Sequence, residues 1–385
     1  MTQLPPQILQ DPALQRVLDA LQAQGDGAWL VGGVVRNALL GEPVDDIDIA
    51  TDATPDRVQA LAHAAGLRAV PTGIDHGTVT LVADGRGFEV TTFRRDVETD
   101  GRHATVAFST DLAEDAARRD FTMNALYADA SGQVIDPVGG LPDLAARHLR
   151  FVGDPNARIA EDYLRLLRFF RFFARYGRQA DPAAVAACAA HRDGLARIAR
   201  ERIGAETKKL LAAPDPGPAV ALMAQTGVLD LVLPGADPAA LDALLAAEPA
   251  PGGWLRRLAA LCPTGPAPDL RLSRAEARAL SALHQASAKG WSLDEAAFRL
   301  SPEAAADHAV LRAAQGHSLP PDLSARIAAA TEIPMPIAAA DLAPLEGPAL
   351  GRALKAAEAA WIASGFTLPA PALIDAAGLA EEDPT

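Results

Sequence analysis

The chain has 385 residues, with 35 Lys and Arg against 49 Asp and Glu, and a formal net charge of -14. This balance speaks against a protein that coats nucleic acid over its whole surface, because phosphate binding needs concentrated Lys and Arg. The 2 cysteines exclude a disulfide framework and a Cys-based metal site. Because no secretory signal and no apolar run of membrane-spanning length is visible, we expect a cytoplasmic protein without membrane contact. The length predicts two or three domains. No obligate protein partner is expected.

The first 140 residues have the pattern of mixed α/β structure. Apolar periodicity and turn residues predict, in chain order, a helix over 12–24, a strand over 29–31, a helical segment over 34–40, a strand over 47–50, a helix over 55–65, a hairpin with strands 78–83 and 88–93, and an edge strand over 133–136. Thr54 and Pro55 are a typical helix start, since Pro suits the first helical position.

From about residue 142 the pattern is helical. A long helix is predicted over 158–177, ending at Gly177. Shorter helices are predicted over 182–193, 197–212, 217–226, 237–247, 253–262, 273–288, 293–299, 302–314 and 321–331, with more beyond. Pro- and Gly-rich joints separate several of them.

The first chemical signal follows the first predicted strand. Gly32 and Gly33 permit a sharp turn and close backbone approach to a ligand, and a helix that begins there offers free N–H groups to phosphate oxygens. Arg36 adds a cation. Asp46 and Asp48 lie two residues apart on the next predicted strand, so both carboxylates are expected on one face. Paired carboxylates suit Mg²⁺, and glycines for phosphate followed by carboxylates for metal are what nucleotidyl transfer requires.

The string Leu-Val-Gly-Gly-Val-Val-Arg-Asn over 30–37, followed by Asp-Ile-Asp over 46–48, resembles the nucleotidyltransferase motif of the polymerase-β superfamily. It is most similar to the class II tRNA nucleotidyltransferases, the CCA-adding enzymes and related bacterial poly(A) polymerases, and the resemblance extends over 28–178. One departure is Asn37, where the family usually has Asp. The resemblance implies an α+β fold with a polymerase-β-like catalytic head containing a mixed sheet over 1–140, a helical neck for nucleobase recognition over 141–213, and a helical body and tail that bind tRNA over 214–385.

Glu89 is a candidate for a third catalytic carboxylate. It alternates with apolar neighbours on the second hairpin strand and is expected to face away from them. If that strand lies beside the Asp46 and Asp48 strand, Glu89 joins the metal carboxylates; an ordinary solvent-facing Glu is an equal alternative.

The string Arg118-Arg119-Asp120, with Asn124 shortly after it, combines two arginine forks with a carboxylate. Arginine forks suit phosphate oxygens, although a surface ion-pair cluster is the alternative. The string is similar to the family block that contacts the sugar and phosphates of the nucleotide. That resemblance implies phosphate binding by Arg119 and, less strongly, Arg118, and a bracing or ribose role for Asp120.

On the long predicted helix, Asp162 and Arg165 are three residues apart and are expected on one face. A carboxylate beside a guanidinium offers an acceptor and donors that match the edges of C and A but not those of G and U; an ordinary surface ion pair is the alternative. The pair resembles the family's nucleobase-reading motif, which implies selection of CTP and ATP without a template. By the same resemblance, Arg168 and Arg171 lie near the triphosphate or the primer.

The distribution of charge along the chain weakens the argument that the negative net charge makes against nucleic-acid binding. Residues 94–209 hold 19 of the 35 basic and 17 of the 49 acidic side chains, a local net of +2, whereas the rest of the chain has a net of -16. Positive charge is therefore concentrated among the candidate binding residues, which suits a triphosphate and one RNA end.

The sequence thus predicts an enzyme that adds C and A to the tRNA 3′ acceptor end from CTP and ATP, with Mg²⁺ held by Asp46 and Asp48 and pyrophosphate released. Poly(A) polymerase and an A-only adding enzyme are alternatives with the same chemistry. A non-catalytic nucleotide-binding regulator is a distant third, because both metal carboxylates are intact. An added His-Asp phosphohydrolase domain is not expected, because the chain contains no His-Asp dipeptide.

Overall fold

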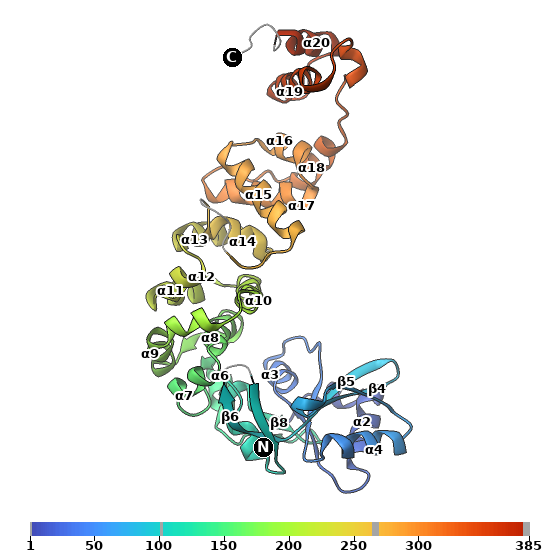
Figure 1. The fold of residues 1–385 in the computed structure, drawn as a ribbon, viewed down its shortest axis with the longest axis vertical. Helices are drawn as coiled ribbons and strands as arrows, with labels where there is room; N and C mark the ends of the chain where they lie inside the picture. Colours follow the sequence, from blue (N-terminus) through green and yellow to red (C-terminus); the bar gives the residue numbers. More distant parts are fainter. Residues whose placement is uncertain (1, 101–102, 264–268, 380–385) are drawn as a thin grey trace. The chain divides into compact units, whose positions relative to one another are not determined.

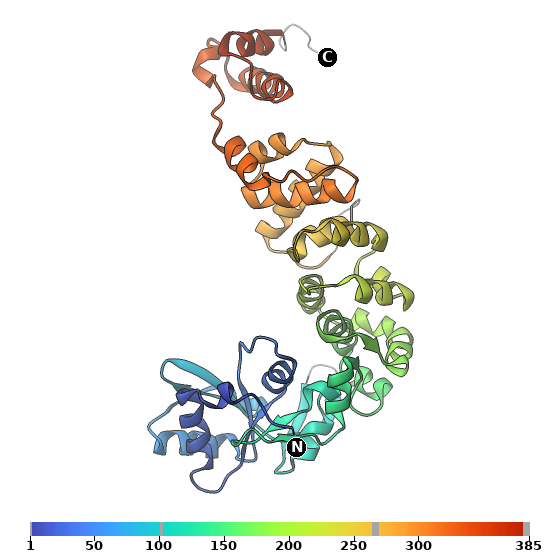
Figure 2. The same ribbon diagram turned by 180° about the vertical axis from the view of Figure 1, so that it is seen from behind.

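The computed structural model describes residues 2–100, 103–263 and 269–379. The chain forms two compact units, 1–234 and 235–385. Strands gather in the blue-to-cyan part of the chain, and the part from green to red is almost entirely helical (Figures 1 and 2), which confirms the predicted α+β class. No helix in the described ranges is long and apolar enough to cross a membrane. The cytoplasmic location and the domain limits at 140 and 213 stay predictions.

The described part of the first unit is built on a mixed sheet of seven strands in the order β3-β4-β5-β2-β1-β8-β9. Only β2 and β5 pair in parallel among these neighbours. The strands are β1 (Ala28–Val31), β2 (Asp48–Thr51), β3 (Arg68–Gly73), β4 (Thr78–Ala83), β5 (Arg86–Thr92), β8 (Tyr127–Ala128) and β9 (Val134–Ile135). This order makes β2, which begins at a candidate metal carboxylate, the central strand of the sheet.

Two helices, α2 (Pro12–Gln22) and α4 (Pro55–Ala64), pack against each other and against β4 (Figure 1). The Asp11 carboxylate caps α2 by accepting from the N–H of Ala13 and Leu14. Apolar residues at helical spacing are buried along α2, namely Leu14, Val17, Leu18 and Leu21. The amphipathic pattern read from the sequence therefore fixes which helix face covers the sheet.

An aromatic cluster joins the end of the sheet region to α8 (Leu164–Tyr176). The ring of Phe121 lies 4.9 Å from that of Phe151 and 5.1 Å from that of Phe172, and the rings of Phe151 and Phe169 stack at 5.6 Å. Aromatic pairs at these distances add to the stability gained from burial. Because the apolar face of α8 is fixed in this way, the position of its arginine face relative to the head is defined as well.

The remaining elements of the first unit are mostly helical. They are α1 (Pro6–Leu9), α3 (Gly33–Leu40), β6 (Arg94–Asp100), β7 (His103–Phe108), α5 (Leu112–Ala117), α6 (Gly140–Ala146), β10 (His148–Leu149), α7 (Pro155–Glu161), β11 (Gln179–Ala180), α9 (Pro182–Ala190), α10 (Arg200–Leu211), α11 (Gly217–Gln225) and α12 (Val228–Val232), with short 3-10 turns at Ile74–His76, Thr122–Asn124 and Arg192–Arg197.

The described part of the second unit is helical throughout. Its helices are α13 (Pro238–Ala247), α14 (Trp254–Leu261), α15 (Arg274–Ala288), α16 (Leu293–Arg299), α17 (Pro302–Ala314), α18 (Leu323–Glu332), α19 (Gly347–Ala363) and α20 (Ala370–Leu379), with a 3-10 turn at Ala339–Leu342. Two apolar clusters hold it together, one around Ala296 and Ala305 and the other around Trp361 and Leu373.

A buried ion cluster also braces the second unit. The Glu248 carboxylate accepts from Arg256 and Arg257, with Nη2 distances of 2.9 Å and 2.8 Å, and Arg256 Nη1 also donates to Asp307 on α17 at 2.9 Å. Because Arg257 is fully buried, its charge depends on compensation such as the Glu248 carboxylate supplies.

The predicted single helix over 158–177 is wrong. Asp162 adopts an extended conformation (φ -150°, ψ 106°) between α7 and α8, and its Oδ1 accepts from the N–H of Leu164 at 3.0 Å. Aspartate competes for backbone donors in this way and therefore favours helix ends over helix interiors. The sequence analysis also missed β3, which contains Pro71, and the pair of strands β6 and β7. Of these two, β6 carries charged residues rather than alternating apolar ones.

Candidate active site

The turn between β1 and α3 brings the backbone against an arginine. Gly32 has φ 71° and ψ -115°, a left-handed conformation that favours glycine. A Cβ at this position would lie 3.4 Å from Nη1 of Arg119 and 3.6 Å from the carbonyl oxygen of Asn124. Gly33 begins α3, so the free N–H groups of the first helical turn lie next to that guanidinium.

Three candidate carboxylates line one hollow of about 460 Å³, together with Asp45 and Arg86. Asp48 begins β2 and is in register with Glu89 on the parallel strand β5. Asp46 precedes the strand instead of lying on it, which corrects the expectation that both aspartates belong to the strand. Phe88 and Val90 are buried while Glu89 is exposed, so Glu89 faces away from its apolar neighbours as predicted.

The electrostatics of the hollow favour a cation. Partial burial and then the charge of Glu89 raise the pKa of Asp48, Asp46 adds to this effect, and the guanidinium of Arg119 opposes it. Mutual repulsion of this kind is relieved when a cation binds between the carboxylates.

The donor set fits a hard divalent cation. The described residues contain no ready-made group of three or more His, Cys, Asp or Glu side chains that could hold a metal ion. Mg²⁺ is usually held by one or two carboxylates together with substrate phosphate oxygens, not by an all-protein cage. Asp46 and Asp48 supply such a pair at the edge of a hollow large enough for a phosphate chain.

Arg36 is a buried cation held by neutral groups. Its Nη1 donates to Asn124 Oδ1, its Nη2 donates to the Tyr176 hydroxyl at 2.9 Å, and its guanidinium carbon lies 4.1 Å from the centroid of the Tyr176 ring. Burial lowers the pKa of Arg36, partly offset by Tyr176. An arginine whose charge is not cancelled by a bound carboxylate is well suited to a phosphate. Sequence reasoning missed Tyr176, because it lies 140 residues away on α8.

Asn37 connects this arginine to the loop that precedes the metal carboxylates. Its Oδ1 accepts from Arg36 Nε at 3.1 Å and Nη2 at 2.9 Å, while its Nδ2 donates to the carbonyl of Pro43 at 2.7 Å. Only this orientation of the amide satisfies both sides. An aspartate would face the Pro43 carbonyl with an acceptor, so the departure from the family's usual residue matches the local geometry of this chain.

A buried carboxylate orients Arg118 and Arg119. Asp115 accepts from Arg118 Nη2 at 2.6 Å, from Arg119 Nη2 at 2.9 Å and from the Tyr127 hydroxyl at 2.6 Å. Burial alone would raise the pKa of Asp115, but the two guanidinium groups and the Tyr127 hydroxyl bring it below its ordinary value. Sequence reasoning did not select Asp115; its spacing of three and four residues from the arginines on a short helix was the available signal.

The Asp120 carboxylate links Arg168 on α8 to Asn124 in the head. It accepts from Arg168 Nε at 2.9 Å, from Asn124 Nδ2 at 3.0 Å and from the N–H of Phe121 at 2.8 Å. Burial opposes ionisation, yet Arg168 and these hydrogen bonds lower the pKa of Asp120 to about 2. Arg36, Asn124, Asp120 and Arg168 therefore form a continuous polar chain from the head to α8.

The other candidates on α7 and α8 have separate partners. Asp162 Oδ2 accepts from Arg202 Nη2 at 2.9 Å, whereas Arg165 Nη1 donates to Glu161 and to the carbonyl of Arg158. The direct Asp162–Arg165 neighbour pair expected on a single helix is therefore not formed. Arg171 lies 2.9 Å from Glu206 on α10, measured from Nε to Oε2.

Two family models match the chain. The model described as the poly A polymerase head domain covers residues 28–150, and the model described as the probable RNA and SrmB-binding site of polymerase A covers residues 179–240. A CCA-adding enzyme of Geobacillus thermodenitrificans is 42% identical over 246 residues, which are 63% of this chain and 57% of the relative. A mitochondrial CCA tRNA nucleotidyltransferase 1 of Danio rerio is 42% identical over 203 residues, or 52% and 47% of the two chains. The chain thus spans about half the length of the curated relatives it matches.

Two solved structures are similar to this chain over most of its length. The Bacillus stearothermophilus CCA-adding enzyme in complex with CTP has a TM-score of 0.74 and 31% identity, covering 92% of this chain and 94% of that one. The Thermotoga maritima CCA-adding enzyme complexed with tRNA has a TM-score of 0.68 at 18% identity over 100% of both chains, a likeness of fold alone. The chain belongs to the class II tRNA nucleotidyltransferase family, which includes the CCA-adding enzymes and the bacterial poly(A) polymerases.

Proposed function

We propose that this protein adds C and A nucleotides to the 3′ acceptor end of tRNA without a template, consuming CTP and ATP and releasing pyrophosphate. The observation that carries the proposal is a hollow of the head that Asp46, Asp48 and Glu89 line together. Arg119, which is next to the Gly32 turn, acts on the charge of Asp48. Relatives named CCA-adding enzymes, one of them solved in complex with CTP, support the proposal.

In this proposal the chain's phosphate-binding groups are the first turn of α3, Arg36 and Arg119. Asp115 and Tyr127 hold Arg119 at the Gly32 turn, and Asn124 with Tyr176 holds Arg36. Because these partners are fixed before the nucleotide arrives, little side-chain entropy is lost on binding. The triphosphate is thereby oriented for in-line attack by the RNA 3′-hydroxyl on its α-phosphate.

Asp46 and Asp48 would hold Mg²⁺, with Glu89 beside them. When bound, Mg²⁺ would activate the attacking hydroxyl and offset negative charge on the reacting phosphates. The chain's own part is to keep the carboxylates ionised and close together, and Arg119 contributes by lowering the pKa of Asp48 against the effect of burial.

Nucleobase selection is assigned to Asp162 and Arg165. Arg202 orients Asp162, and Glu161 orients Arg165. Each of the two base-selecting side chains is therefore held in place by its own partner. Arg165→Ala should relax the preference for CTP and ATP over UTP and GTP more than it weakens tRNA binding. An unchanged preference would reduce Arg165 to a structural role.

The test is incubation with tRNA that lacks its 3′ end, in the presence of CTP, ATP or both, followed by sizing of the product on a gel. Addition that stops at CCA supports the proposal. A long ladder with ATP alone would instead indicate a poly(A) polymerase, and ATP incorporation only after CC is present would indicate an A-adding enzyme. No incorporation with an intact fold would favour the regulator.

A further inference from the structure

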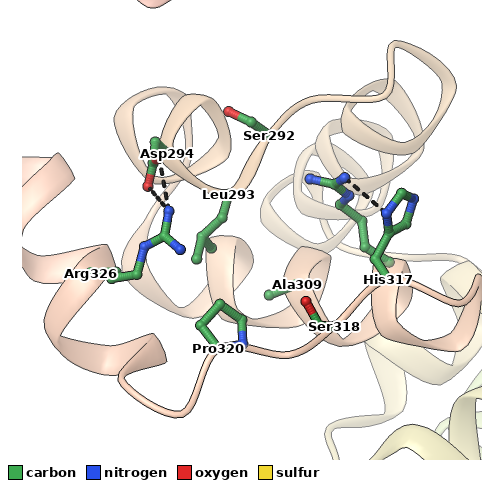
Figure 3. A pocket seen from close by; sticks show the side chains of 9 residues that line it. Ser292, Leu293, Asp294, Ala309, His317, Ser318, Pro320 and Arg326 are labelled. Atoms are coloured by element: carbon green, nitrogen blue, oxygen red, sulfur yellow. Dashed lines mark hydrogen bonds and ion pairs between the residues drawn. The ribbon is translucent and has the colours of Figure 1, made fainter. Parts of the chain in front are cut away.

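The second unit contains a hollow lined by arginine. Its volume is about 260 Å³, and the residues lining it come from α16, α17, α18 and the loop between the last two helices. In Figure 3, His317 and Arg326 lie on opposite sides of the hollow, with Ser318 and Pro320 between them. Ser292, His317 and Ser318 are exposed, so solvent reaches this site.

Arg312 gives the hollow an uncompensated charge. Its Nη1 donates to the carbonyl of Trp291 at 3.2 Å, and its Nη2 lies 3.3 Å from Nδ1 of His317. Within the described part of the chain it forms no ion pair with a carboxylate. The side chain is therefore fixed by neutral acceptors while its charge stays available, which is the arrangement already seen for Arg36 in the head.

Arg326 is only partly neutralised. Its Nη2 lies 2.9 Å and 3.0 Å from the two oxygens of Asp294, and both side chains are about two-fifths exposed, at 41% and 40%. An ion pair this exposed is weak. The hollow has a net charge of about +1. Its two guanidinium groups are opposed by one carboxylate, and the His317 imidazole accepts a hydrogen bond from Arg312.

We infer that this hollow binds one phosphodiester of an RNA backbone. A singly charged phosphodiester matches a net charge of about +1, whereas a phosphate dianion would face Asp294 with an excess of negative charge. Arg312 and Arg326 supply donor forks, and the hydroxyls of Ser292 and Ser318 supply further donors. The inference rests on the proposed function for the presence of RNA, and it adds a specific contact in the second unit.

The test compares Arg312→Gln and Arg326→Gln with Arg352→Gln, a matched loss of charge at an exposed position of α19. Affinity for tRNA lacking its CCA end is measured over a series of KCl concentrations. Arg312→Gln should weaken binding about tenfold and reduce the salt slope by about one, with the Arg326 variant smaller and the control smallest. Equal effects of Arg312→Gln and Arg352→Gln would overturn the inference.

Two further measurements keep the outcome interpretable. Arg312→Lys retains a charge and should recover most of the salt slope, which a merely structural arginine would not do. Inorganic phosphate, matched to KCl in ionic strength, should displace tRNA no better than chloride does. Displacement by phosphate from the wild type but not from Arg312→Gln would assign the hollow to a free dianion and overturn the RNA assignment.

Wild-type incorporation of CTP and ATP is measured in the same preparation. Failure of the wild type to extend tRNA refutes the proposed function. Normal extension with no difference between the Arg312 variant and the control refutes only the inference about the hollow.

Discussion

The two hollows carry opposite charge. The hollow in the head is lined by Asp46, Asp48 and Glu89, while the one in the second unit is lined by Arg312 and Arg326. In the head, the charge of Arg119 opposes the repulsion that Glu89 and Asp46 exert on Asp48, and Arg86 lines the same hollow. In the second unit a single carboxylate, Asp294, offsets one of two arginines. The first arrangement suits the proposed metal with its triphosphate, and the second suits the proposed phosphodiester.

The pairing of individual arginines accounts for phosphate binding, as proposed here, by a chain with a net charge of -14. Most arginines around the head site are engaged by carboxylates, such as Arg168 by Asp120 and Arg171 by Glu206. Arg36 and Arg312 instead have neutral partners. Arg119 differs from both, because it shares the Asp115 carboxylate with Arg118. The net charge of the chain reports none of these local differences.

The largest expected effect is the loss of nucleotide incorporation when a carboxylate of the head hollow is removed. Asp48→Ala should reduce nucleotide incorporation by about a thousandfold or more, because one of two metal carboxylates is lost. The unfolding temperature without divalent cations should stay the same or rise, since the variant relieves repulsion from Glu89 and Asp46. Gel assays and thermal melts measure the two effects, with Asp56→Ala at an exposed position of α4 as control. Near-normal incorporation would refute the metal assignment.

The buried arginines of the second unit supply the next test. Glu248→Gln leaves Arg256 and Arg257 without their shared carboxylate and should cost about 3–5 kcal/mol of unfolding free energy. Denaturation followed by tryptophan fluorescence reports on this unit, which contains Trp254, Trp291 and Trp361. Glu303→Gln, at an exposed position of α17, is the matched control. Equal stability of the two variants would show that the charge of Glu248 is not required beside the partners that remain, such as Asp307 for Arg256.

Asp120 gives a smaller, pH-dependent effect. Its pKa of about 2 is below the ordinary value of 3.8, so its ionised form stabilises the fold above about pH 4, and this stability is lost as the pH falls toward 2. Asp120→Asn should therefore cost about 2 kcal/mol of unfolding free energy near neutral pH and progressively less under acid. Unfolding measured at several pH values tests this. A cost that does not change with pH would mean that packing, not charge, is responsible.

The smallest effect is expected at Asn37. Asn37→Asp keeps an acceptor for Arg36 but loses the donor to the Pro43 carbonyl, and should cost about 1 kcal/mol of unfolding free energy. Asn37→Ala, which loses both contacts, should cost more. If the aspartate variant were as stable as the wild type, the amide contact with the loop would contribute nothing.

Periodicity and turn residues were enough to predict much of the fold. Helices α2, α4, α15, α16 and α17, the β4–β5 hairpin and the edge strand β9 lie where the sequence predicts them, within a few residues. These elements have a clear apolar face or a strong turn signal, and both are local properties of the chain. The break at Asp162 was missed because apolar periodicity does not report the cap that the Asp162 side chain forms on the N–H of Leu164. Strands β6 and β7 were missed because β6 carries Arg, Asp and Glu and lacks an alternating apolar pattern.

By itself the sequence determined the residue types of the candidate site in the head: glycines at the turn, carboxylates at the start of β2 and just before it, and Glu89 on the opposite face from Phe88. These features follow from residue type and from spacing along one strand or turn. Only the tertiary structure decided which arginine meets which acceptor, as with Arg36 and Tyr176, Asp162 and Arg202, and Arg312 and the Trp291 carbonyl. The reason is that a long side chain can reach many partners, and only the packing of distant helices determines which of them is near.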